Sequence, residues 1–128
     1  MTKTAWAHLP NAKHIDAVLA DVRKRPEAWE VAWNTVQAEA GYVAQNAAWY
    51  AAWTVARDPA RTTAWTVAWD AAQHTAWDAI AALTAWDSSA DLLECAPDVL
   101  RAMIDLAEPP VCYQAVLLLP YATVRFGT

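Results

Sequence analysis

Residues 64–80 read AWTVAWDAAQHTAWDAI, and an Ala-Trp pair recurs in them at intervals of four or eight residues. The same register continues upstream in residues 48–58, AWYAAWTVARD, and in residues 28–33, AWEVAW. Seven of the nine tryptophans share it: Trp29, Trp33, Trp49, Trp53, Trp65, Trp69 and Trp77. Each follows an alanine and precedes a mostly polar position, whereas Trp86 lies outside the register. A period of four is close to the 3.6 residues of a helical turn, so the repeat predicts α-helices.

The repeat also limits the length of those helices. A step of four residues turns about 400°, so a column of side chains drifts by about 40° at every repeat. Two or three repeats keep the indole rings on one side of a helix, and five carry them well around it. Gly41 and Pro59 interrupt the register and are expected to reset its phase.

Capping and breaking residues give the expected boundaries. Asn11 is expected to be the N-cap of the first helix and Asp58 the N-cap of the fourth. Pro109-Pro110 is a further break, and the last helix is expected to stop before Pro120. The expected helices are about 12–24, 26–40, 42–57, 59–86, 91–95, 97–107 and 111–119.

Composition supports an all-α protein. The 128 residues include 31 alanines, only two glycines and 57% hydrophobic residues, which favours helix and suffices for a core. We expect a compact bundle of about five to seven short antiparallel helices. It forms a single domain over 1–128, with the repeat helices at 26–86 and acidic and apolar helices at 87–128.

The net charge of −5 is unevenly distributed. Residues 1–61 carry seven Lys/Arg and six Asp/Glu, whereas residues 62–128 carry two and eight. An acidic half argues against binding to nucleic acid and favours a basic partner or solubility. The longest uncharged stretches, 40–56 and 109–124, are too short or too polar to span a membrane, and Pro10 and nearby charges interrupt any signal peptide. Cys95 and Cys112 are expected to be reduced, so the predicted location is the cytoplasm of a bacterial host.

The aromatic residues are the first candidate site. Nine tryptophans exceed what so small a core easily covers, and tryptophan is favoured at protein interfaces. We expect a partner-binding surface, or an aromatic ligand cage, formed by Trp49, Trp53, Trp65, Trp69, Arg57 and Arg61. Arg57 should stack on Trp53 and Arg61 on Trp65, because each pair is spaced i,i+4.

A second candidate site is polar. Asp70, His74 and Asp78 are spaced i, i+4 and i+8, so one continuous helix would place them on neighbouring turns, where they could bind a divalent metal or a small molecule. The alternative interpretation is that they occupy the solvated column of the repeat. No phosphate-binding loop, HExxH or GxSxG motif occurs, so we expect no enzyme, no catalytic residue and no cofactor.

The segments AWEVAW, AWYAAWTVARD and AWTVAWDAAQHTAWDAI resemble the Ala-rich repeats of small helical phage and bacterial proteins, some of immunity type. The segment AVLLLP at 115–120 resembles the tail of small phage proteins. The resemblance covers about 28–120 and implies a neutralising role, with no catalytic residue. The leading hypothesis is therefore a non-enzymatic protein-binding module, with a homodimer as one form. The alternatives are a ligand- or metal-binding protein and a self-assembling structural protein.

Overall fold

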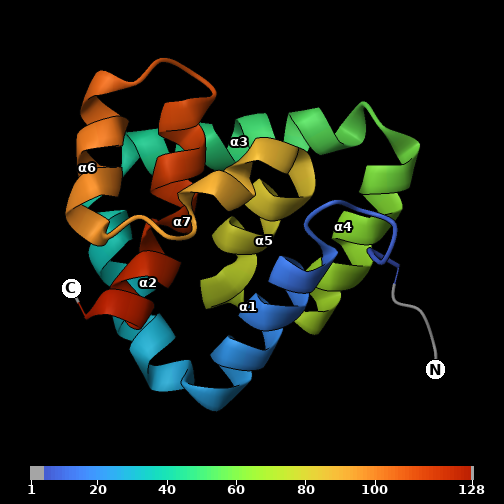
Figure 1. Ribbon diagram of the computed structural model, residues 1–128, viewed down its shortest axis with the longest axis horizontal. Coiled ribbons are helices and arrows are strands. Elements are labelled where there is room, and N and C mark those ends of the chain that lie inside the picture. The colour runs from blue at the N-terminus through green and yellow to red at the C-terminus, as the bar shows by residue number, and fades with distance from the viewer. Residues whose placement is uncertain (1–4, 128) are drawn as a thin grey trace.

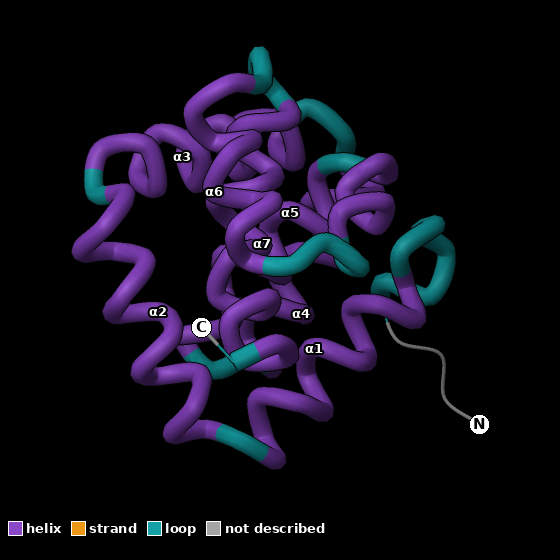
Figure 2. Tube along the Cα trace, turned by 60° about the vertical axis from the view of Figure 1, so that its left-hand side comes forward, coloured by secondary structure: helices purple, strands orange, loops and turns teal. Residues whose placement is uncertain are grey.

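The computed structural model describes residues 5–127, and Figures 1 and 2 show helices joined by loops over that range. No strand occurs in it, so the expectation of an all-α bundle of short helices is confirmed. The α-helices are α1 (Ala12–Lys24), α2 (Pro26–Ala40), α3 (Tyr42–Ala56), α4 (Pro59–Ala71), α5 (Trp77–Ala85), α6 (Pro97–Leu106) and α7 (Val111–Phe126). Two 3₁₀ segments are η1 (His74–Ala76) and η2 (Asp87–Leu92).

The helix α5 lies in the middle of the molecule, in contact with α1, α3, α4 and α7 (Figure 1). Every residue from 79 to 85 is buried, because this stretch has small or apolar side chains on all sides and no charge. The helix α7 contacts α2, α3, α5 and α6 and supplies the other large part of the core. Within residues 5–127, no helix has both the length and the apolar character that crossing a bilayer requires.

The predicted long helix over 59–86 is wrong. The helix α4 ends at Ala71, Ala72 and Gln73 are extended, and α5 starts at Trp77. The break has neither proline nor glycine. Instead, the Trp77 ring stacks on Trp69 at 4.1 Å, and its indole nitrogen donates to the Trp69 carbonyl at 3.2 Å. The Trp69 carbonyl also accepts from the Ala72 N–H at 3.2 Å, so the indole is a second donor at the end of α4, and the break lets α5 turn back into the core.

The predicted end of the last helix before Pro120 is also wrong. The helix α7 continues through the proline to Phe126. Beyond it, Tyr121 stacks on the buried Trp29 ring at 5.5 Å, and Arg125 donates to the Leu93 carbonyl at 2.6 Å. Because proline removes one helical hydrogen bond and not the whole ladder, packing on both sides of residue 120 keeps the helix intact.

The α3 helix shows the drift of the repeat directly. Its buried side is formed by Ala44, Ala47, Ala51 and Val55. Those residues follow the helical period of 3.6 residues. The alanines that recur every four residues therefore drift out of the core along α3, and Ala56, the last of them in this helix, is exposed. The buried alanines let α3 lie close to α5 and α7, and the same geometry turns Trp49 and Trp53 toward solvent.

Candidate functional site

The outer side of α3 carries a cluster of exposed rings. Trp49 is 61% exposed and Trp53 is 48% exposed, and their rings are parallel at 6.3 Å. Tyr50 lies edge-on to both indoles and stacks on Tyr113 of α7 at 4.8 Å. We call these four residues, together with Arg57, the α3 aromatic face. No charged residue lies between Ala40 and Ala56, so the face is uncharged until Arg57.

The two arginines of the predicted site behave differently. The Arg57 guanidinium lies 4.6 Å from the centre of the Trp53 ring, as predicted, and forms no ion pair with another residue of the 5–127 range. Stacking of Arg61 on Trp65 was the wrong prediction. Arg61 instead pairs with Asp58 at 3.3 Å and Asp87 at 2.8 Å, and donates to the Thr84 carbonyl at 2.8 Å. Arg61 therefore connects α4 to the end of α5, whereas the Arg57 guanidinium has no carboxylate partner within residues 5–127.

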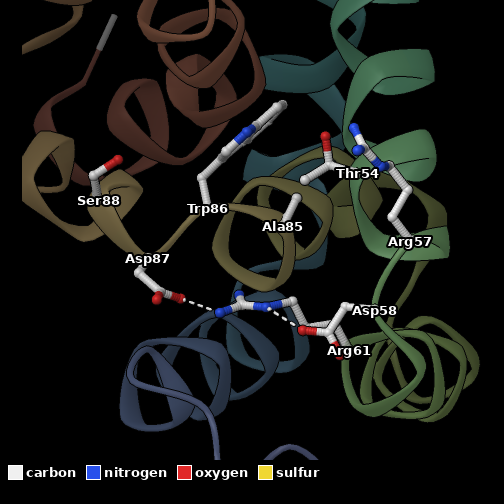
Figure 3. A pocket seen from close by; sticks show the side chains of 8 residues that line it. All are labelled: Thr54, Arg57, Asp58, Arg61, Ala85, Trp86, Asp87 and Ser88. Carbon is white, nitrogen blue, oxygen red and sulfur yellow. Dashed lines mark hydrogen bonds and ion pairs between the residues drawn. The ribbon is translucent and has the colours of Figure 1, made fainter.

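A groove runs along the edge of this face. One hollow of about 550 Å³ is lined by Thr54, Arg57, Asp58, Arg61, Ala85, Trp86, Asp87 and Ser88. A second, of about 260 Å³, is lined by Tyr50, Thr54, Trp86, Pro109, Pro110 and Tyr113. Thr54 and Trp86 line both, so the two hollows adjoin. Figure 3 shows Arg61 reaching between Asp87 and Asp58 at one side of the larger hollow, with Trp86 and Thr54 at the other.

The α4 tryptophans form a separate cluster. Trp65 and Trp69 are half-buried, their centroids lie 4.8 Å apart, and Trp69 stacks on Trp77. In the described part of the chain no ring contact joins this cluster to Trp49 or Trp53. The predicted cage of four tryptophans is therefore divided between two places, and the α4 rings mainly hold the α4–α5 break.

The three polar candidates lie on three different elements. Asp70 is in α4, His74 in η1 and Asp78 in α5, so their expected placement on one helix is wrong. His74 pairs with Glu30 at 3.6 Å when it is protonated, and its ring lies edge-on to Trp33. These residues form no group able to hold a metal, and neither does any other set of three His, Cys, Asp or Glu within residues 5–127.

Asp78 is the carboxyl whose environment is most unusual. Burial raises its pKa to about 6, against the lowering effect of hydrogen bonds from Gln37, at 3.2 Å, and from Trp33. The folded state favours the protonated Asp78 carboxyl, so the stability that this group contributes is fully present below the pKa that it has in the unfolded chain. That contribution is lost as the pH rises through its folded pKa of about 6.

We therefore expect Asp78→Asn to raise the free energy of unfolding at pH 7.5 by about 2 kcal/mol, because the buried charge is gone. Urea denaturation at several pH values would measure this. As the pH rises from about 4 to about 7, the free energy of unfolding should fall less in the variant than in the parent. Asp70→Asn removes an exposed carboxylate and is the matched control. An unchanged pH profile in Asp78→Asn would contradict the assignment.

Sequence reasoning missed all three aromatic residues of the groove: Tyr50, Trp86 and Tyr113. Tyr50 occupies the polar column of the repeat, and Tyr113 comes from a helix without the repeat, so neither stood out. Trp86 could have been found because it lies outside the four-residue register. In the structure it is the C-cap of α5 and does not belong to a repeat face.

Comparisons of the chain with models of protein families, with curated proteins and with solved structures found no significant match.

Proposed function

We propose that this chain is a non-enzymatic protein-binding module whose α3 aromatic face contacts the partner. One observation carries the proposal: the exposed side of α3 combines Trp49, Tyr50 and Trp53 with Arg57 and has no other charge. Interface centres are enriched in Trp, Tyr and Arg and depleted in other charged residues. A solvent-facing helix without such a role ordinarily carries charged residues on that side.

The acidic C-terminal half adds a second element to the proposal. Exposed carboxylates lie on η2, α6 and the loops next to them: Asp87, Asp91, Glu94, Asp98, Asp105 and Glu108. They would steer a partner with basic residues around an apolar contact patch. The resemblance of the repeat to immunity-type proteins favours a neutralising role, in which binding itself is the activity.

The test compares capture by the parent protein and by Trp49→Ala/Trp53→Ala. Both rings are exposed, Trp49 to 61% and Trp53 to 48%, so we expect the double variant to stay folded and to lose partner capture by about a hundredfold, as hot-spot residues do. Chemical cross-linking and affinity capture from a bacterial or phage-infected lysate would measure the loss.

The control variant is Phe126→Ala, which removes a 46% exposed ring at the far end of α7. It should capture as the parent does. Capture that survives the double tryptophan substitution would overturn the proposed face. Light scattering over a dilution series would identify a second copy of the chain as the partner.

A further inference from the structure

We infer that the groove beside α3 binds a proline-rich segment in the polyproline II conformation, with an acidic residue at one end. This inference rests on the proposed function and names the partner chemistry of the same region. It is carried by three features of the groove: its aromatic walls, its unpaired hydrogen-bond donors and its single open cation.

The walls fit proline rings. Tyr50 and Tyr113, stacked on each other at 4.8 Å, line this part of the groove together with Trp86, Pro109 and Pro110. Grooves lined by aromatic side chains bind polyproline II segments, because the rigid ligand loses little entropy on binding. From Tyr50 to Arg57 the groove follows α3 for about 10 Å. At about 3.1 Å per residue, a polyproline II segment of about three or four residues spans it.

The polar groups fit the backbone of such a segment. In the described part of the chain, the Trp86 indole nitrogen and the Tyr50 and Tyr113 hydroxyls have no hydrogen-bond partner, although all three rings line the groove. A polyproline II segment has no internal hydrogen bonds and no proline N–H, so its carbonyl oxygens are free to accept. Indole and phenol donors therefore complement it, whereas a helix uses its carbonyls in its own hydrogen bonds.

The wall that carries Trp86 is held in place. The Trp86 carbonyl accepts from Asn11 Nδ2 at 3.1 Å and from the Ser89 hydroxyl at 2.7 Å. A groove wall fixed in this way loses little freedom when a ligand binds.

The charged end of the groove selects the flanking residue. Asp58 and Asp87 both pair with Arg61, whereas the Arg57 guanidinium lies on the Trp53 ring and has no carboxylate partner within residues 5–127. A glutamate or aspartate next to the prolines would pair with Arg57 while its guanidinium stays on the Trp53 ring.

The probe is an acetylated, amidated peptide of six prolines followed by two glutamates, titrated by calorimetry. Matched peptides replace glutamate by glutamine or proline by alanine. We expect saturable binding of the first peptide, about tenfold weaker binding after Trp86→Phe, and loss of binding when proline is replaced by alanine. The preference for glutamate over glutamine should disappear in Arg57→Gln. Trp49→Phe, outside the groove, is the matched control and should bind as the parent does.

Chemical shifts of the indole N–H groups provide a second readout. The resonance that is absent from the spectrum of Trp86→Phe belongs to Trp86, and in the parent protein it should shift more than the other indole resonances when peptide is added. If Trp86→Phe does not fold, Tyr113→Phe removes a second groove donor and should weaken binding by about three- to tenfold. No binding at millimolar peptide, equal binding of the alanine peptide, or a dimer that depends on Trp86 would each overturn the inference. Partner capture that depends on Trp49 and Trp53 would still support the proposed function in those cases.

Discussion

Trp29→Ala is expected to lower the free energy of unfolding by about 3–5 kcal/mol, enough to leave much of the protein unfolded at 37 °C. Trp29 is the largest fully buried side chain. It stacks on Tyr121, and its indole nitrogen donates to Asp21 Oδ2 at 2.8 Å. The alanine variant would leave a large cavity between α2 and α7 and remove the donor to Asp21 Oδ2, whereas Asp21 Oδ1 would keep its pair with Arg25. Urea denaturation followed by circular dichroism would measure the shift in midpoint.

Two further variants separate the causes of this effect. Trp29→Phe keeps most of the ring packing but loses the donor to Asp21, so we expect about half the destabilisation. Trp49→Ala removes the same kind of side chain from an exposed position of the same repeat register, and its midpoint should change little. Equal effects of Trp29→Ala and Trp49→Ala would mean that the buried position of Trp29 is wrong.

Asn11→Asp is expected to destabilise the protein by more than about 3 kcal/mol at pH 7, although it changes a single atom. Asn11 is buried, and its amide nitrogen donates to the carbonyls of Leu83, at 3.0 Å, and Trp86, at 3.1 Å. An aspartate there would place an ionised oxygen against the carbonyl oxygens of Leu83 and Trp86 and remove the amide donor from both.

The comparison variant is Asn11→Ala, which removes the amide donor from both carbonyls but adds no charge, so it should cost less than Asn11→Asp. Lowering the pH to about 4 should narrow the difference, because a protonated aspartate regains one donor. Urea denaturation of both variants at both pH values measures this. A smaller cost for aspartate than for alanine at pH 7 would contradict the arrangement around residue 11.

Asn11 also shows where sequence rules stop. It precedes α1 as predicted, but its side chain makes no capping bond to the helix. It points instead to the end of α5, more than seventy residues away in the chain. Asp58 was predicted by the same rule and does cap α4, accepting from the Ala60 N–H at 3.1 Å. A local rule names the residue suited to a cap, and long-range contacts decide whether the side chain is used for that.

The candidate site follows the same division. Trp53 and Arg57 are four residues apart on one helix, so their contact could be predicted from spacing. The contact of Tyr50 with Tyr113 joins α3 to α7, and the groove joins both to Trp86 at the end of α5. No periodicity within a single helix contains that information.

The sequence by itself determined that this chain is all-α, where most of its helices begin, and that Ala-Trp pairs recur in one register over 28–77. These properties depend on backbone propensity, capping residues and period, which act over a few residues. Only the tertiary structure decided which of the repeated tryptophans are buried, because a four-residue column drifts around a helix of 3.6 residues per turn. Trp29 therefore lies in the core, Trp69 and Trp77 hold the α4–α5 break, and Trp49 and Trp53 remain exposed on the α3 aromatic face.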